Sequence, residues 1–278
     1  VALSSAASFA QINKGELKQL QNFLSQPAKE AATNAEALRI TNIKDPSTWE
    51  GVTVTGNRVT KIDWKDKKLA GTLDLSGFTA LTSVDVSRNA LTAVTVKGDA
   101  ALNELNASRN KLTEINLEGA TSLVKLSINN NRLTEFTLEG TPIIKSINVA
   151  SNLLASLDLN ASPTLETLNC QSNHLENLSV ANCTALKNLY CGYNKLTNLD
   201  LVGVVKLQNL NLDDNQISGM IVSGLPSLAT FVCSDNRMKT LGMRDCNALM
   251  DVVCSYNDLT TFDVSNCPNI IFVDCSYN

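Results

Sequence analysis

The sequence predicts an α/β fold in which short parallel strands stack into a solenoid behind an N-terminal helical cap. Three observations predict this fold: an asparagine returns every 21 residues, apolar residues occupy fixed positions around it, and apolar and polar residues alternate in the segment before it. A constant period over most of a chain of 278 residues indicates one structural unit that is repeated and stacked.

The repeat keeps its register through ten asparagines without an insertion or deletion. One apolar column begins at Leu81 and ends at Ile270, and a second begins at Leu91 and ends at Leu259. The recurring asparagines are Asn89, Asn110, Asn131, Asn152, Asn173, Asn194, Asn215, Asn236, Asn257 and Asn278. Because every column continues from repeat to repeat, equivalent residues are expected to lie one above another.

Each repeat predicts one strand, one turn and one further extended segment. The L-x-L segment before the asparagine has a period of two, so its apolar residues point inward and the residues between them face outward. The half after the asparagine alternates as well, which favours short extended or 3₁₀ segments, since 21 residues are too few for a full crossover helix. The asparagine follows the strand, where its amide can satisfy backbone groups in a buried turn. The ten amides are therefore expected to form a structural ladder.

These motifs resemble those of the leucine-rich-repeat family. The family pattern L-x-x-L-x-L-x-x-N is met by LTSVDVSRN at residues 81–89, by LVKLSINNN at 123–131 and by LQNLNLDDN at 207–215. The short period is most similar to bacterial surface-type repeats, including secreted or lipid-anchored proteins of gut anaerobes and, more distantly, internalins. The resemblance covers about residues 59–278 and implies a right-handed solenoid of about ten coils, mostly strand and coil, with a parallel sheet on its concave face.

Residues 1–58 depart from the repeat and are predicted to form an N-terminal cap, because a solenoid needs one to cover its first coil. Asn13 followed by Glu16 is a capping-box pattern that predicts a helix near residues 14–25. A second capping box begins at Thr33 and predicts a short helix through Ala37, Leu38 and Ile40. Within the cap, residues 1–10 have the small and apolar character of the end of a secretory signal peptide. The alternative for residues 1–10 is an ordinary frayed terminus or the start of a helix.

The last repeat stops at Asn278, halfway round a coil, with no change of composition that could close the core. We therefore expect an uncapped C-terminal end that is covered by further repeats, by another domain or by a partner. Self-association through this end is one such arrangement.

Cysteines and the single histidine raise the question of a metal site between residues 170 and 191. Cys170, His174, Cys183 and Cys191 are suitable zinc ligands by type, but no two of these cysteines form the close pair that structural zinc sites use. All eight cysteines of the chain fall in apolar columns. The sequence thus predicts buried thiols and no metal.

Composition argues against several other functions. The net charge is −4 and no Lys/Arg cluster is present, so nucleic acid is not an expected partner. No stretch is apolar for long enough to span a bilayer. One histidine in a variable column and eight core thiols offer no nucleophile with a base, and burial makes thiols inert, so we expect neither an enzyme nor a cofactor.

The binding surface is predicted on the concave face of the C-terminal half, where aromatic and acidic residues gather among polar ones. Such a mixture of aromatic anchors and polar surround is typical of protein interfaces. The alternative is that Val232 and Val253 simply favour strands, and that further coils of the intact protein cover the aromatic residues near Tyr277. Single exposed apolar residues often carry no function. The predicted contact residues are Tyr190, Tyr193, Asn211, Asp213, Val232, Asp235, Val253, Tyr256, Phe272 and Asp274.

With the resemblance, these observations indicate a non-enzymatic recognition or adhesion module that is exported to the periplasm or cell surface. Its expected ligand is a protein, such as a host or cell-surface protein. Two alternatives remain: a cytoplasmic signalling scaffold, and the targeting domain of a larger secreted enzyme.

Overall fold

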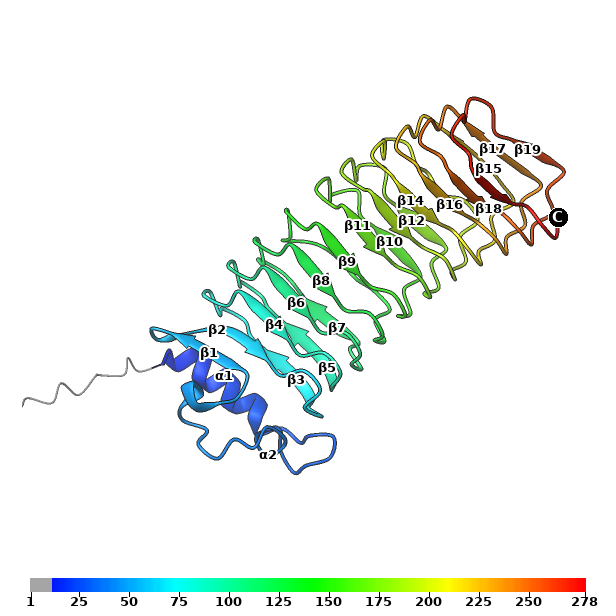
Figure 1. Cartoon of the computed structure of the whole chain (residues 1–278). Helices are drawn as coiled ribbons and strands as arrows, with labels where there is room; N and C mark the ends of the chain where they lie inside the picture. Colours follow the sequence, from blue (N-terminus) through cyan, green and yellow to red (C-terminus); the bar gives the residue numbers. More distant parts are fainter. Residues whose placement is uncertain (1–11) are drawn as a thin grey trace, which may run out of the picture.

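The computed structural model describes residues 12–278 as a stack of coils with a small helical cap at its N-terminal end (Figure 1). The signal-peptide hypothesis concerns residues 1–10, which lie outside the described residues. None of the helices among residues 12–278 combines the length and the apolar character needed to cross a bilayer.

One sheet of twelve strands runs the whole length of the stack and forms its concave face. Neighbouring strands pair in parallel with a shift of one repeat, as Leu168 pairs with Leu189 and Leu189 with Leu210. The exception is the first pair, which is antiparallel. In order, the strands are β1 (Val52–Thr55), β2 (Arg58–Asp63), β4 (Ser83–Asp85), β6 (Glu104–Asn106), β8 (Lys125–Ser127), β9 (Ser146–Asn148), β11 (Thr167–Asn169), β13 (Asn188–Tyr190), β14 (Asn209–Asn211), β16 (Thr230–Val232), β18 (Asp251–Val253) and β20 (Phe272–Asp274).

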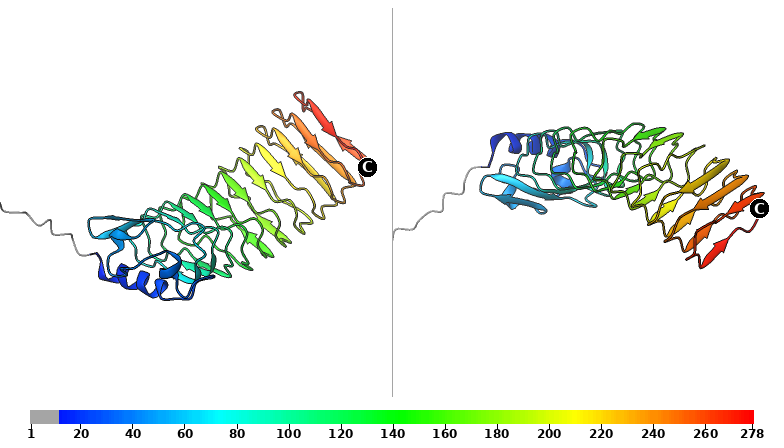
Figure 2. Two further views of the ribbon diagram at one scale, coloured as in Figure 1. Left: turned by 60° about the horizontal axis from the view of Figure 1, so that its bottom comes forward. Right: turned by 90° about the horizontal axis from the view of Figure 1, so that it is seen from above.

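The opposite, convex side carries three shorter sheets, so the expected extended segments are present but interrupted. The first sheet contains β3 (Ala70–Asp74), β5 (Ala90–Thr95) and β7 (Glu114–Asn116); the second, β10 (Ser156–Asp158) and β12 (Asn177–Ser179); the third, β15 (Gly219–Ser223), β17 (Thr240–Arg244) and β19 (Thr261–Asp263). Residues 134–138 and 197–201 lie between these sheets without strand structure. The stack bends along its length (Figure 2), in keeping with one continuous and one interrupted side.

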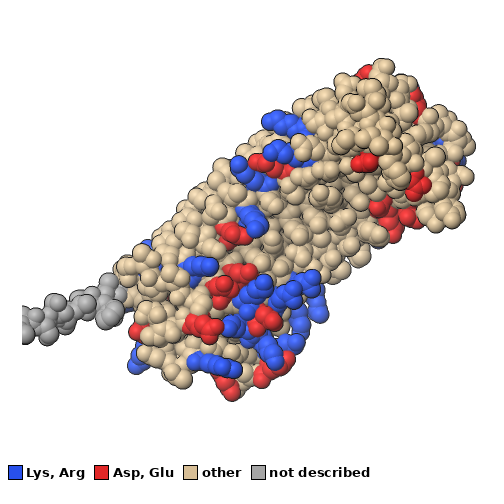
Figure 3. Space-filling model, in the orientation of Figure 1, with Lys and Arg blue, Asp and Glu red and all other residues tan. Residues whose placement is uncertain are grey.

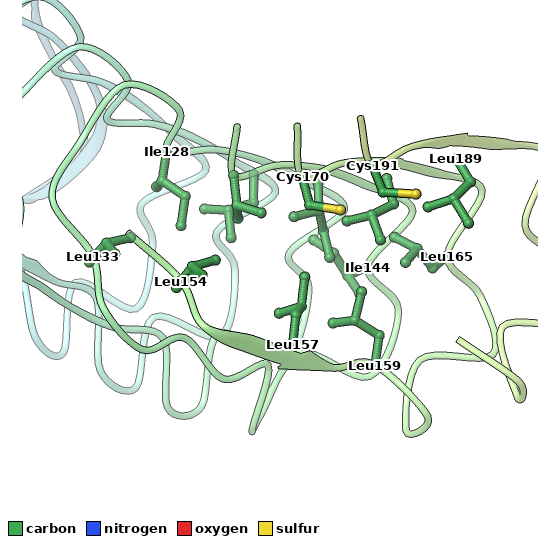
Figure 4. Close-up of a cluster of buried hydrophobic side chains, with 14 of the residues drawn as sticks. Ile128, Leu133, Ile144, Leu154, Leu157, Leu159, Leu165, Cys170, Leu189 and Cys191 are labelled. Carbon is green, nitrogen blue, oxygen red and sulfur yellow. The ribbon is translucent and has the colours of Figure 1, made fainter. Parts of the chain in front are cut away.

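The core is a single column of apolar side chains between the two sides. Figure 4 shows a part of it that spans several successive coils, where the sulfurs of Cys170 and Cys191 lie among leucines and isoleucines. Seven of the eight cysteines are buried, as the columns predict. The exception is Cys275, which is exposed because β20 is the last strand and no further coil packs over it.

The cap consists of α1 (Lys14–Leu24), α2 (Asn34–Ala37) and the 3₁₀ turn η1 (Pro46–Thr48). Phe23 of α1 stacks on Trp64, with ring centroids 5.8 Å apart, and both rings are buried. The Nδ2 of Asn34 donates to the carbonyl oxygens of Phe23 and Ala70, and its Oδ1 accepts from the Ala70 amide. Because Asn34 is fully buried, these bonds attach the cap firmly to the first coil.

Two expectations for the cap are wrong in detail. The second helix ends at Ala37 rather than continuing through Ile40, because Arg39 adopts a left-handed conformation with φ 56° that stops it. Asn13 does cap α1, but Glu16 does not complete a capping box. Instead its buried carboxylate accepts from Arg58 Nε at 2.6 Å and from the Val59 amide at 2.9 Å, and so holds α1 against β2.

Candidate functional site

The asparagine ladder joins neighbouring coils through their backbones. Asn152 is buried, and its Oδ1 accepts from the Leu133 amide of the preceding coil at 3.1 Å. Its Nδ2 donates to the carbonyl oxygens of Ile128 at 3.1 Å and Val149 at 2.9 Å. The same arrangement recurs up to Asn278, where Oδ1 accepts from the Leu259 amide. The amides therefore join neighbouring coils and satisfy backbone groups in the turns that follow the strands.

Eight of the ten predicted contact residues fall into two groups by position. Five lie in one row across adjacent strands of the concave sheet, with successive members paired in the parallel register. These are Tyr190, Asn211, Val232, Val253 and Asp274, and all five are half-buried. The structure thus brings this row together as one continuous strip of the sheet.

The second group lies just past the strands, where the chain leaves the concave face. Tyr193, Asp235 and Tyr256 are exposed and have left-handed backbones, each directly before a ladder asparagine. Tyr256 stacks on Tyr277, with centroids 4.4 Å apart and planes 7° from parallel. Tyr277 lies one repeat after Tyr256 in the sequence, and this spacing predicts that the two rings lie side by side.

Two of the predicted acidic residues are already engaged within the protein. Asp213 accepts from the Ser234 amide at 2.8 Å and from Asn211 Nδ2 at 3.2 Å, and burial raises its pKa. Asp274 accepts from the hydroxyl and the amide of Ser276, and these bonds lower its pKa. Both residues shape the strip, but they have less capacity for a ligand than the exposed Asp235.

Phe272 lies on β20 at the C-terminal edge, apart from the central row. Ile271, Phe272 and Tyr277 are respectively 80%, 52% and 71% exposed there. This is the end at which the sequence led us to expect self-association, which stays a prediction.

Charge is unevenly distributed along the solenoid. On the face drawn in Figure 3, Lys and Arg gather over the cap and the N-terminal coils, interspersed with acidic residues, while acidic side chains are the more visible charges over the C-terminal coils. Asp214 and Asp235 are exposed at that end, beside the aromatic group. The candidate surface therefore combines aromatic rings with an acidic surround.

The fold decides the classification. The twelve-stranded parallel sheet, the one-repeat register and the buried asparagine ladder together define a leucine-rich-repeat architecture. The chain is a leucine-rich-repeat solenoid. The Leucine Rich Repeat family model matches residues 206–228, and no curated protein matches the chain.

Solved structures share this fold at low sequence identity. The functional domain of InlJ from Listeria monocytogenes, which includes a cysteine ladder, is 22% identical with a TM-score of 0.53, over 78% of this chain and 58% of that one. YopM, a leucine-rich effector protein from Yersinia pestis, is 24% identical with a TM-score of 0.56, over 73% and 65%. The leucine-rich repeat domain of APL1B is 22% identical with a TM-score of 0.57, over 70% and 61%. The predicted resemblance to bacterial leucine-rich-repeat proteins is confirmed at the level of the fold, and the solenoid spans less than two thirds of each of these chains.

The cysteines of this solenoid also stand in columns, and all eight are free thiols. Burial raises the pKa of Cys170 to about 12 and that of Cys183 to about 11. The sulfur of Cys170 lies 3.6 Å from the Tyr190 carbonyl oxygen and that of Cys191 lies 3.4 Å from the Asn211 carbonyl oxygen, so each thiol points to the next coil's backbone. Such thiols are poor nucleophiles and poor metal ligands.

We expect all eight cysteines to remain reduced when the purified protein is exposed to air. Parallel Cβ directions on neighbouring strands do not bring two sulfurs into disulfide geometry. Titration with Ellman's reagent in denaturant, without reductant, should recover the full number of thiols. A titre that falls short by a pair of thiols would contradict this expectation.

Proposed function

We propose that the solenoid is a non-enzymatic module that recognises or adheres to a protein, and that it acts after export to the periplasm or cell surface. Leucine-rich-repeat folds serve as protein-recognition modules, and the fold of this chain supports a function of that broad kind. The proposal that the concave face binds a protein rests on one observation. Tyr190, Val232 and Val253 lie in one strip of the sheet, beside the exposed rings of Tyr193 and Tyr256.

The physical support is the rigidity of this strip. Side chains fixed on a hydrogen-bonded sheet lose little freedom on binding, and tyrosine adds a large contact area at a small entropic cost. The exposed carboxylates of Asp214 and Asp235 provide a polar rim. A protein ligand whose contact surface has an apolar centre and a cationic or polar rim would complement this strip.

Export is supported by the sequence of residues 1–10 and by the resemblance to secreted bacterial repeats. Fractionation of cells that express the intact open reading frame tests it directly. Recovery of the protein in the cytoplasm would favour the signalling scaffold, whereas a catalytic domain elsewhere in the reading frame would favour the targeting domain of an enzyme.

Binding through the concave strip predicts a loss of affinity in Tyr190→Ala and Tyr256→Ala. Each variant should weaken binding of the partner by about 1 kcal/mol or more, because tyrosines that a partner covers contribute much of the binding energy of such interfaces. A photoreactive phenylalanine analogue at position 190 should capture that partner from extracts, and calorimetry then measures the two alanine variants. The melting temperature should change little, since Tyr256 is exposed and Tyr190 half-buried.

Glu114→Ala is the matched control, because Glu114 is exposed on the opposite, convex side. Its affinity should equal that of the parent. An equal loss in Glu114→Ala, or unchanged affinity in both tyrosine variants, would move the binding surface away from the concave face.

A further inference from the structure

One column of residues follows the edge of the solenoid at which the chain leaves the concave strands. It begins at Arg88 and ends at Tyr277, and each member directly precedes a ladder asparagine. All members have left-handed backbones, with φ between 49° and 59°. All except the half-buried Ser151 are exposed. We call this column the turn edge, and its side chains extend to solvent from successive tight turns.

Charge is segregated along the turn edge, with cations in the N-terminal coils and carboxylates in the C-terminal coils. Arg88 and Arg109 occupy one adjacent pair of coils, and Asp214 and Asp235 occupy another. None of these four side chains forms an ion pair with any residue among 12–278. Figure 3 shows a similar separation of charge over the face that it draws.

Such a succession of like charges is unfavourable within one solenoid. Equivalent residues of adjacent coils lie about 4.8 Å apart, and like charges at that spacing repel each other. On the concave sheet the sign alternates instead, as in the ion pair between Glu104 and Lys125 at 2.7 Å. Burial raises the pKa of Asp213, and the charges of Asp235 and Asp214 beside it raise that pKa further. A partner of opposite charge would relieve the repulsion at both ends of the turn edge.

We infer that the turn edge is a dimer interface, which takes a second copy of this chain in antiparallel orientation. A two-fold axis between Ser151 and Ser172, perpendicular to the length of the solenoid, sets the turn edge of one copy against the same edge of the other. Arg109 and Asp214 are equally far from this axis along the repeat. Arg109 of each copy therefore faces Asp214 of the other.

The other contacts of this arrangement are also complementary. Arg88 faces Asp235, and Asn130 faces the ring of Tyr193, because each pair is again equally far from the axis. The two serines at the centre have small side chains, which allow the edges to approach closely. The axis follows the radius of the bend seen in Figure 2, so the two edges curve alike and both concave faces point the same way.

Only this register pairs both arginines with aspartates. A shift of the axis by half a coil toward the N-terminus sets Asp235 against Asp66, which has the equivalent left-handed turn in the first coil. The same shift toward the C-terminus sets Arg88 against Tyr256 and leaves Asp214 without a cation. A shift by a whole coil in either direction pairs neither arginine with an aspartate. The sequence of the turn edge thus specifies one register for a symmetric pair.

The inference goes beyond the proposed function and does not rest on it. Asp214 and Asp235 also belong to the polar rim of the concave strip, but the dimer leaves the strip itself open. Exposed ion pairs each contribute little free energy, so the dimer should be weak and sensitive to salt. Its test needs no ligand, so a failure of the proposed function and a failure of the dimer are distinguishable.

Sedimentation equilibrium of the full 278-residue chain, at about 20 mM and about 500 mM salt, tests the interface. The parent should dimerise at low salt and dissociate at high salt. Arg109→Asp should dimerise about tenfold more weakly or worse, because an aspartate then faces Asp214 at two symmetric contacts. Its melting temperature should not fall, since the change separates two like charges. The matched control is Lys206→Asp, which makes the same charge reversal at an exposed residue of the opposite edge and should leave dimerisation unchanged.

A mixture of two variants separates the interface from any effect on folding. Asp214→Arg should also dimerise poorly by itself, because the new side chain faces Arg109. Arg109→Asp mixed with Asp214→Arg should recover the dimer, since both contacts of the mixed pair again join opposite charges. Arg109→Asp mixed with Asp235→Arg should not recover it, because positions 109 and 235 do not face each other.

Three results would each overturn the inference. The first is a parent that stays monomeric at every concentration at low salt. The second is an Arg109→Asp variant that associates as the parent does, as it would through the exposed edge of β20. The third is equal behaviour of the two mixtures.

Discussion

Replacing Asn152 by alanine should lower the free energy of unfolding by about 1 to 3 kcal/mol, because the variant leaves buried backbone groups without partners. The amide of Leu133 and the carbonyl oxygens of Ile128 and Val149 all lose a hydrogen bond in this variant. Asn152 is only 4% exposed, so water cannot reach these groups freely. Leucine at this position should cost more, since it adds bulk to the same unsatisfied turn. Urea denaturation followed by circular dichroism measures both variants.

Asn278 provides the control for this prediction. It makes the equivalent bonds to Leu259 and to the carbonyl oxygens of Cys254 and Cys275, but it is exposed. Because water can replace the lost partners there, Asn278→Ala should cost much less than Asn152→Ala. If Asn152→Ala unfolds at the same urea concentration as the parent, the ladder does not stabilise the solenoid as its geometry implies.

The 21-residue period is enough to predict the solenoid, because equivalent residues of successive repeats lie one above another in columns. The one-repeat shift between Leu168 and Leu189 follows directly from the 21-residue period, as does the burial of Cys170 and Cys191. A period cannot predict the ends, where the columns stop. Glu16 is such a case: its pattern predicts a capping box, but its carboxylate pairs with Arg58, which is remote in the sequence.

The candidate surfaces were predictable to different degrees. The row from Tyr190 to Asp274 follows from alternation along the strands, and the Tyr256–Tyr277 stack follows from the period. The engagement of Asp213 by Ser234 depends on side-chain rotamers, which no period specifies. The interruption of the convex sheets at residues 134–138 left no signal in the sequence, because residues 133–140, LTEFTLEG, differ little from LTEINLEG at 112–119, which contains β7.

Asp99 occupies an interior column, and its burial predicts that the stability of the protein depends on pH. Its equivalents are Phe78 and Ala120 in the neighbouring coils, and its side chain is fully buried. Neither carboxylate oxygen has a hydrogen-bond partner of good geometry. Burial raises its pKa from 3.8 to about 7, and the backbone amides of Phe78 and Gly77 offset only part of that effect. The nearby carboxylates of Asp74 and Glu16 raise it slightly further.

The sign of the effect follows from proton linkage. Between about pH 4 and pH 7 the folded protein holds a proton on Asp99 that the unfolded chain has lost, so the free energy of unfolding falls as pH rises through this range. A shift of about three pKa units sets an upper limit of about 4 kcal/mol on the loss. Asp99→Asn should remove this slope and should make the protein more stable than the parent at pH 8, because no charge is then buried. Urea denaturation between pH 4 and pH 8 measures both proteins, with the exposed Asp258→Asn as the control that should keep the parent's slope. An unchanged slope in Asp99→Asn would mean that the Asp99 carboxyl group reaches water in the folded protein.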